Sequence, residues 1–183
     1  MKSQNYFKKE GGCLVWITGL PGAGKTTLAN EVYGLIKDTT PAVCIDGDVI
    51  REMMGDGLGY DPESRKLNAW RLAKLSKYLT EHHLTVICST VSLIKEIHLW
   101  NRNNVKNLIE VYIEVPVDEL VKRDQKKLYS KALSGEIKDA YAINQPYDVP
   151  EKPDLIIKNA GDVGFLLGYA PKIKSMILGE PSG

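Results

Sequence analysis

The chain has 183 residues, of which 43% are hydrophobic and 26% charged, and its formal net charge at pH 7 is +1. This length suits one domain with a sizeable core, and so small a net charge excludes a strongly basic nucleic-acid-binding surface. No apolar run is long enough for a membrane helix. We expect a cytoplasmic domain over residues 11–183 after a flexible basic tail over residues 1–10, which lack the apolar segment of a secretory signal.

The first predicted strand covers residues 14–18 and is followed by GLPGAGKT at residues 19–26. This run matches the pattern G-x-x-x-x-G-K-[ST], and apolar residues then recur at helical spacing over residues 27–36. A strand, a glycine loop and a helix in this order form a phosphate-binding loop, in which backbone N–H groups hold phosphates. The motif predicts ATP binding, with Lys25 on the β- and γ-phosphates and Thr26 on Mg²⁺. A plain strand-to-helix turn would need neither residue.

Further apolar runs alternate with helical stretches along the chain, at residues 42–45, 85–88, 108–115 and 155–157. Strands separated by helices predict a parallel sheet with right-handed crossovers. The expected fold is therefore α/β, a P-loop NTPase-type sheet between two helix layers. Ligands bind such sheets at the carboxyl ends of the strands, and polar clusters follow these runs.

Two carboxylates flank a glycine where the second run ends, at Asp46 and Asp48, with Arg51 close behind. Phosphoryl transfer to a hydroxyl needs a partner for Mg²⁺ and a group that accepts the proton of the acceptor. Asp46 and Asp48 can divide these tasks between them. The alternative is an Asx turn with a helix cap, since Asp and Gly favour both.

The next predicted helix carries Arg65, Asn68 and Arg71. Arg65 and Asn68 are three residues apart and share one helix face, whereas Arg71 lies further round. Arginine together with an amide suits an anionic nucleotide. The alternative is an ordinary solvated helix face.

A dense basic stretch, RDQKKLYSK, covers residues 123–131. Several cations close together are typical of a lid that closes over a triphosphate, and we expect a mobile lid at about residues 123–147. An exposed basic helix is the alternative.

The cysteines and two of the histidines predict no metal site. Cys13, Cys44 and Cys88 match no metal-binding spacing and are expected to be buried free thiols. His82 and His83 are expected to be exposed at the end of a helix.

Taken together, these motifs resemble the adenylylsulfate kinase family. The resemblance covers about residues 13–160. It is carried by residues 17–27 (ITGLPGAGKTT), 46–51 (DGDVIR), 58–60 with Arg65, Asn68 and Arg71, 123–132 (RDQKKLYSKA), 135–138 (GEIK) and 146–153. The resemblance implies ATP-dependent phosphorylation of the 3′-hydroxyl of adenosine 5′-phosphosulfate, which gives PAPS and ADP. It also implies Mg²⁺ and a homodimer, with a small nucleotide and neither nucleic acid nor membrane as the partner.

The resemblance also implies roles for individual residues. Asp48 resembles the proposed catalytic base and acts with Lys25, while Thr26 and Asp46 would hold Mg²⁺. The ATP contacts would be Gly22, Ala23, Gly24, Lys25, Thr26, Thr27, Arg123 and Lys126. The acceptor contacts would be Arg51, Tyr60, Arg65, Asn68, Val91, Ser92, Lys131 and Tyr141.

Three segments depart from the family pattern, and two of them concern the acceptor. The family reads S-F-I-S-P-[FY]-R where residues 89–95 read STVSLIK, and F-T-G-I-D where residues 140–144 read AYAIN. It also reads K-G-L-Y where residues 126–129 read KKLY. Tyr141 can replace the phenylalanine that holds the acceptor base only if the register shifts by one residue.

A divergent branch resembles the chain in these same places and phosphorylates cytidine 5′-diphosphoramidate in capsule synthesis. That acceptor is therefore the alternative to adenosine 5′-phosphosulfate. A second alternative is a non-catalytic nucleotide-binding module, but such a module is expected to have lost Lys25 or Asp48, and both are present.

Overall fold

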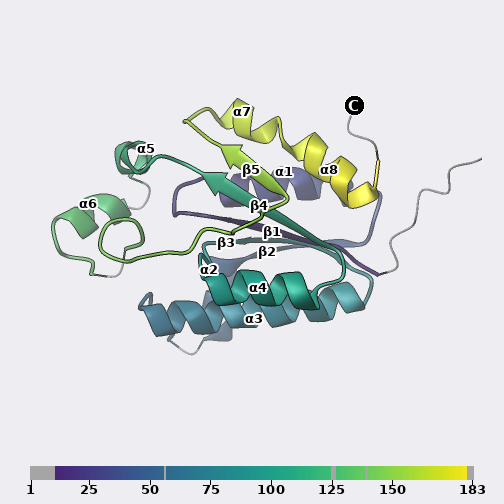
Figure 1. The fold of residues 1–183 in the computed structure, drawn as a ribbon, viewed down its shortest axis with the longest axis horizontal. Helices are drawn as coiled ribbons and strands as arrows, with labels where there is room; N and C mark the ends of the chain where they lie inside the picture. Colours follow the sequence, from purple (N-terminus) through teal and green to yellow (C-terminus); the bar gives the residue numbers. More distant parts are fainter. Residues whose placement is uncertain (1–10, 56, 125–126, 139, 181–183) are drawn as a thin grey trace, which may run out of the picture.

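The structure is a computed structural model that describes residues 11–55, 57–124, 127–138 and 140–180. The predicted tail and Lys126 lie outside these residues. The described chain forms a five-stranded parallel sheet in the order β2-β3-β1-β4-β5 (Figure 1). The strands are β1 (Leu14–Gly19), β2 (Ala42–Asp46), β3 (Thr85–Thr90), β4 (Leu108–Glu114) and β5 (Leu155–Lys158). The predicted parallel sheet is confirmed.

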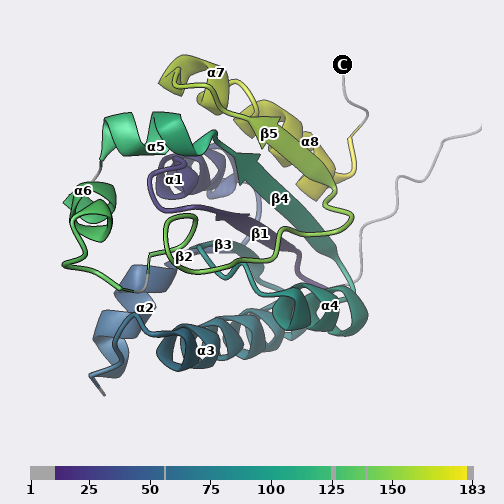
Figure 2. The same cartoon turned by 60° about the vertical axis from the view of Figure 1, so that its left-hand side comes forward.

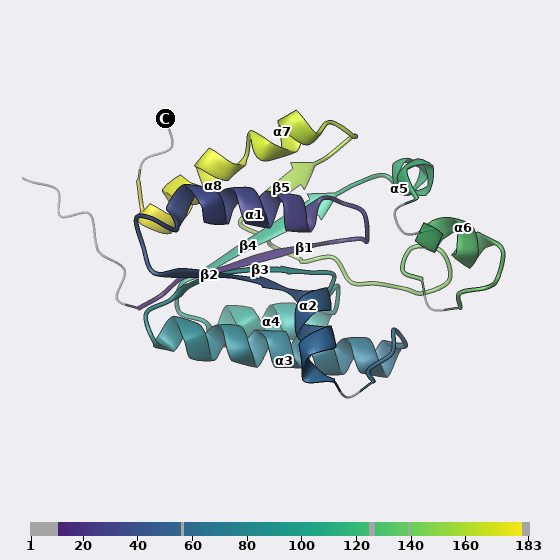
Figure 3. The ribbon, with the colours of Figure 1, turned by 180° about the vertical axis from the view of Figure 1, so that it is seen from behind.

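Helices cover both faces of this sheet. They are α1 (Lys25–Ile36), α2 (Gly47–Met54), α3 (Pro62–Glu81), α4 (Lys95–Asn104), α5 (Val117–Arg123), α6 (Leu128–Leu133), α7 (Val163–Leu167) and α8 (Ala170–Leu178). Figures 1 and 3 show α1, α7 and α8 on one face and α3 and α4 on the other. The expected three-layer architecture is therefore also confirmed.

The central strand β1 explains why both faces are covered. All six of its residues are buried, and successive side chains of a strand point to opposite faces. Val15 and Ile17 belong to the apolar cluster with α1 and α8, whereas Leu14 and Trp16 belong to the cluster with α3 and α4. An unbroken apolar run is what a strand covered on both faces requires.

Helices α2 and α3 both begin at an aspartate that caps the helix. The carboxylate of Asp46 accepts a hydrogen bond from the backbone N–H of Asp48 and so caps α2. Asp61 caps α3 in the same way through the N–H of Ser64, and Pro62 occupies the first turn. These caps fix the direction in which α2 and α3 leave the sheet.

The basic stretch that was expected to form a lid is not one continuous helix. Helix α5 ends at Arg123, the backbone is left-handed at Asp124 (φ 34°) and Lys127 (φ 55°), and α6 begins at Leu128. The Asp124 carboxylate accepts hydrogen bonds from the N–H groups of Tyr129 and Ser130. Figure 2 shows both helices beyond the end of β4.

Two smaller expectations can be compared with the structure. All three cysteines are free, but only Cys13 and Cys88 are buried. Cys44 is half-buried because it lies on β2, which is an edge strand of the sheet. His82 and His83 are exposed after α3, as expected.

Among the described residues, no helix has the length and apolarity needed to span a membrane.

Candidate active site

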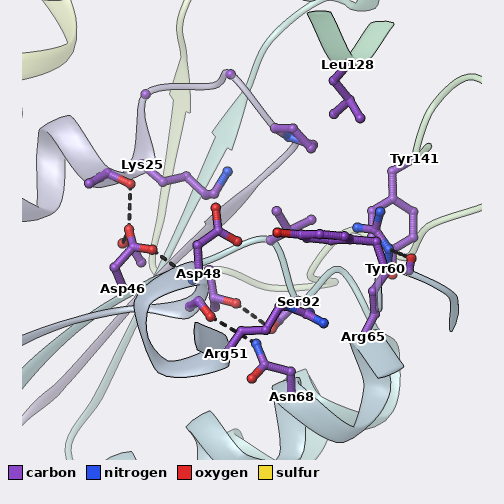
Figure 4. A pocket seen from close by; sticks show the side chains of 18 of the residues that line it. Lys25, Asp46, Asp48, Arg51, Tyr60, Arg65, Asn68, Ser92, Leu128 and Tyr141 are labelled. Carbon is purple, nitrogen blue, oxygen red and sulfur yellow. Dashed lines mark hydrogen bonds between the residues drawn. The ribbon is translucent and has the colours of Figure 1, made fainter. Parts of the chain in front are cut away.

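A cavity of about 570 Å³ opens at the carboxyl ends of β1, β2 and β3 (Figure 4). Its wall combines the phosphate loop, the start of α2, one face of α3, the loop after β3 and residues of the 128–141 segment. The lining residues are Pro21, Gly22, Gly24, Lys25, Thr26, Thr27, Asp46, Gly47, Asp48, Arg51, Tyr60, Arg65, Asn68, Ser89, Thr90, Val91, Ser92, Ile94, Leu128, Lys131, Ile137 and Tyr141.

The phosphate loop needs glycine at two positions for reasons that the structure makes plain. A Cβ atom at Gly24 would lie 2.5 Å from a methyl carbon of Leu166, and Gly24 has a φ of +98°. A Cβ atom at Gly19 would lie 2.6 Å from the carbonyl oxygen of Ile113. The contact at Gly19 is with backbone that cannot give way, so the loop can pack against β4 only with glycine there. At Gly24 the left-handed φ favours glycine, and a side chain would in addition have to displace the Leu166 methyl group.

Lys25 begins α1 and is almost fully buried beside the loop. Its ammonium group donates a hydrogen bond of 2.9 Å to the carbonyl oxygen of Leu20. Burial lowers the pKa of Lys25 to about 8, although the nearby carboxylates of Asp48 and Asp46 act to raise it. The site therefore holds a poorly solvated cation whose best additional partner would be an anion in the cavity.

Asp46, at the end of β2, accepts hydrogen bonds from two hydroxyl groups. Its Oδ2 atom accepts hydrogen bonds from Thr26 Oγ1 at 2.7 Å and from Ser89 Oγ at 2.8 Å. Burial acts to raise the pKa of Asp46, but these bonds and those from the backbone N–H groups of Asp48 and Val49 hold it below the usual value. Asp46 is thus an ionised carboxylate next to a threonine hydroxyl. Oxygen donors of this kind suit Mg²⁺.

Asp48 lies in the first turn of α2, and its side chain is exposed to the cavity. Figure 4 shows its carboxylate pointing toward the ammonium group of Lys25 and away from the capping carboxylate of Asp46. The two carboxylates of the DGD motif therefore have different surroundings. Asp46 is held by hydroxyl groups and by α2, whereas Asp48 lies on the cavity wall next to Lys25.

Cations and aromatic rings alternate in the other half of the cavity. The Arg51 guanidinium lies 4.7 Å from the centre of the Tyr60 ring, and the Arg65 guanidinium lies 5.6 Å from the same centre. Arg65 also lies 4.6 Å from the centre of the Tyr141 ring. Tyr141 is 8% exposed, and burial raises the pKa of its phenol, while Arg65 acts to lower it. Tyr141 thus lies on the cavity wall, next to Ala140, which stands where the family pattern has phenylalanine.

The floor of this half is polar. Asn68 is buried in α3 and donates from Nδ2 to the carbonyl oxygen of Gly47 at 3.1 Å, while its Oδ1 atom has no hydrogen-bond partner among the described residues. The hydroxyl groups of Thr90, the last residue of β3, and of Ser92, in the loop after it, lie 2.7 Å apart. The Thr18 hydroxyl donates to the carbonyl oxygen of Val91 and ties this loop to β1.

Most of the predicted site residues that the structure describes lie on the wall of this one cavity. Two do not: Ala23 is fully buried, and Arg123 donates to the carbonyl oxygens of Gly22 at 3.2 Å and Asn159 at 3.4 Å. Lys126 lies outside the described residues. Among the described residues, no group of three or more His, Cys, Asp or Glu side chains could hold a metal ion.

Several wall residues had no contact role in the prediction. Ser89 and Thr90 follow from the rule that ligands bind at the carboxyl ends of strands, because they end β3. Ile94 belongs to the loop after β3. Leu128 and Ile137 carry no comparable signal, since only the path of the chain after α5 brings them to the cavity.

Comparison with known proteins agrees with this geometry. A family model described as adenylylsulphate kinase matches residues 11–158. The cytidine diphosphoramidate kinase of Campylobacter jejuni is 40% identical over 148 residues, which cover 80% of this chain and 86% of that protein. An adenylyl-sulfate kinase of Chloroflexus aurantiacus is 39% identical over 148 residues, which cover 80% of each chain.

A solved structure shows the same likeness in three dimensions. The Mycobacterium tuberculosis APS kinase in complex with AMPPNP and APS superposes with a TM-score of 0.81 at 29% identity. The superposition covers 91% of this chain and 97% of that one. The family model alone spans well over half of the sequence. The chain belongs to the adenylylsulphate kinase family.

Proposed function

We propose that this protein is an ATP-dependent kinase that phosphorylates the ribose 3′-hydroxyl of a nucleoside 5′-anhydride. The acceptor that we favour is adenosine 5′-phosphosulfate, which would give PAPS and ADP. One observation carries the proposal. A single cavity joins a phosphate loop to a second half built from arginines and tyrosines, with Asp48 between them. Two nucleotides bound in the two halves would meet at Asp48.

ATP would occupy the half formed by residues 22–27. Backbone N–H groups of the loop and the start of α1 face bound phosphates in this motif. Lys25 would exchange the Leu20 carbonyl oxygen for the phosphate oxygens, because a charged partner compensates its burial better than a neutral one. Arg123 and Lys126 remain proposed ATP contacts.

The donor set of Thr26 and Asp46 fits Mg²⁺, since a hydroxyl and an ionised carboxylate already lie within hydrogen-bond distance. The ion would neutralise charge on the β- and γ-phosphate oxygens. Asp48 would accept the proton of the ribose 3′-hydroxyl. That oxygen would then bond to the γ-phosphorus while the bond from the γ-phosphorus to the β,γ-bridging oxygen breaks and ADP leaves.

The acceptor nucleotide would occupy the half with Arg51, Tyr60, Arg65 and Tyr141. The guanidinium groups suit its 5′-anhydride, and the rings offer flat faces to its base. Asn68 Oδ1 has no partner among the described residues, and a ribose hydroxyl would supply one. Val91, Ser92 and Lys131 complete the proposed contacts on the wall.

Cytidine 5′-diphosphoramidate is the second candidate acceptor. Two observations favour it. The chain is 40% identical to a cytidine diphosphoramidate kinase. Thr90 and Tyr141 line the cavity, and both stand in segments that depart from the family pattern. A hydrogen-bonding site can reject the wrong base by several orders of magnitude. The substrate preference should therefore be clear-cut.

One assay decides between the two acceptors. The protein with MgATP would be given each acceptor in parallel while ADP release is followed. A higher kcat/KM for adenosine 5′-phosphosulfate supports the proposal, and a higher value for cytidine 5′-diphosphoramidate replaces the acceptor. ADP release with neither, but with a simple nucleoside monophosphate, would contradict both. No acceptor-dependent ADP release at all would support a non-catalytic module.

The cellular setting and assembly of the enzyme remain proposals. We propose a cytoplasmic enzyme that forms a homodimer, as the family resemblance implies. Size-exclusion chromatography with light scattering would measure the oligomeric state, and a monomer at micromolar concentration would contradict the dimer.

A further inference from the structure

The carbonyl groups of the phosphate loop are held by side chains. Four successive carbonyl groups, from Leu20 to Ala23, each accept a hydrogen bond from a side chain. Leu20 accepts from Lys25 at 2.9 Å, and Pro21 accepts from the phenol of Tyr129 at 2.8 Å. Buried carbonyl groups need such partners. Lys25 lines the cavity, whereas the donors to the other three carbonyl groups do not and reach the loop from outside it.

The other two carbonyl groups, like that of Pro21, accept from residues far away in the sequence. The carbonyl oxygen of Gly22 accepts from Arg123 at 3.2 Å, and that of Ala23 accepts from Asn159 Nδ2 at 3.1 Å. Tyr129, Arg123 and Asn159 lie 108, 101 and 136 residues from the carbonyls that they contact. Three bonds of the loop therefore depend on the C-terminal half of the molecule.

Two of these donors are themselves firmly placed. Tyr129 is 1% exposed, and its N–H donates to the carboxylate of Asp124. Asn159 is 3% exposed, its N–H donates to the Glu114 carbonyl oxygen, and its Oδ1 accepts from the N–H of Gly161. These side chains are already ordered, so nucleotide binding costs little further entropy at these positions. They can therefore hold the loop carbonyl groups in a fixed orientation.

We infer that Tyr129 and Asn159 are positioning residues that set the shape of the phosphate loop before nucleotide arrives. Neither side chain lines the cavity, so their effect on the nucleotide passes through the carbonyl groups of Pro21 and Ala23. Because Tyr129 belongs to α6, the same hydrogen bond joins the base of the proposed lid to the loop. This inference rests on the proposed function, since it assumes that the loop binds ATP.

The test is the substitution Tyr129→Phe, which removes one hydroxyl group and keeps the ring that fills the core. Losing a hydrogen bond of this kind should weaken MgATP and MgADP binding roughly 3- to 10-fold. The KM of the nucleoside acceptor should not change, because the Tyr129 side chain does not line the cavity and its hydroxyl donates to the Pro21 carbonyl oxygen of the phosphate loop. Isothermal titration calorimetry gives the nucleotide affinities, and steady-state kinetics gives both KM values.

Tyr112→Phe is the matched control. Tyr112 is also buried, on β4, and among the described residues it makes no hydrogen bond to the loop carbonyl groups. It should leave nucleotide affinity unchanged even if it lowers the melting temperature. Asn159→Ala should weaken MgATP binding as Tyr129→Phe does, and its melting temperature is recorded beside it. Tyr129→Phe remains informative if Asn159→Ala does not fold.

The outcomes separate this inference from the proposed function. If the wild-type protein binds MgATP and Tyr129→Phe binds it equally well, the positioning role is wrong while the kinase proposal stands. If Tyr129→Phe raises the KM values of ATP and acceptor alike, its role is general stability and the inference is also wrong. If the wild-type protein binds no MgATP, the proposed function has failed first.

Discussion

The two halves of the cavity are built in different ways. The phosphate half is made mainly of backbone, with glycines where a side chain would clash or strain the chain and carbonyl groups held by side chains from the C-terminal half. The acceptor half is made of side chains that contact one another, and its Tyr60 ring is 57% exposed. A change of side chain would therefore alter the acceptor without disturbing the fold, whereas the phosphate half tolerates little change.

The largest effect should follow from Lys25→Ala in the phosphate half. The substitution removes the cation that would stabilise charge developing on the β- and γ-phosphates, so kcat should fall on the order of 10³-fold. The fall should be the same for every acceptor, because Lys25 belongs to the half that all acceptors share. ADP release measures turnover.

Lys37→Ala, an exposed lysine beyond the end of α1, is the control and should behave as wild type. Circular dichroism should show a folded Lys25→Ala protein, because the deleted ammonium group was poorly solvated in its buried position. Turnover near the wild-type level in Lys25→Ala would remove the basis for the kinase proposal.

Asp48→Asn tests the residue at the boundary between the two halves. The substitution keeps the shape of the side chain but removes the proton acceptor, so kcat should fall roughly 10²-fold or more while ATP affinity is largely kept. Glu52→Gln makes the same chemical change four residues further along α2 and should have little effect. Lost ATP binding with a normal kcat at saturation would instead make Asp48 a binding or metal residue.

The sequence predicted the phosphate half well because its rules are local. A strand, a glycine loop and a helix follow one another in the chain, and Asp46 directly ends a strand. The bonds from Tyr129 and Asn159 could not be predicted, because they join residues more than 100 positions apart. No local pattern encodes which carbonyl group a distant side chain will reach. The same reason explains why Leu128 and Ile137 were missed on the wall.

The acceptor half shows a second limit of the sequence. Arg65 and Asn68 were placed correctly on one helix face, since helical spacing alone determines that. The stacking of Arg65 on Tyr141 depends on the path of the segment between α6 and β5, where the structure contains no further helix among the described residues. Without a regular element there is no period from which to infer a direction. The contact between Tyr141 and Arg65 therefore became known only from the structure.

Tyr141→Leu should separate the two halves. Loss of the ring removes both its contact with Arg65 and a face for the acceptor base, and aromatic stacking on a base is worth enough to raise the acceptor KM about 10-fold. The KM of ATP should not change. Tyr141→Phe keeps the ring and should retain most of the acceptor affinity. Equal increases in both KM values would show that Tyr141 supports the whole cavity and that the two halves are not independent.

The smallest expected effect is a dependence of nucleotide affinity on pH. The pKa of Lys25 is about 8 in the nucleotide-free protein, and a phosphate anion would bind better to its charged form. Lys25 is mostly protonated at pH 7 and mostly neutral above its pKa, so MgATP affinity should fall roughly four-fold between pH 7 and pH 8.5. Calorimetry in two buffers of different ionisation enthalpy should show proton uptake on binding near pH 8.

The same group should make the stability of the nucleotide-free protein depend on pH. The unfolded chain keeps the proton of Lys25 up to the ordinary pKa of 10.5, whereas the folded chain loses it near pH 8. The free energy of unfolding should therefore rise between pH 8 and pH 10.5. Lys25→Met should abolish both trends, and a pH dependence that persists in Lys25→Met would place the titrating group elsewhere.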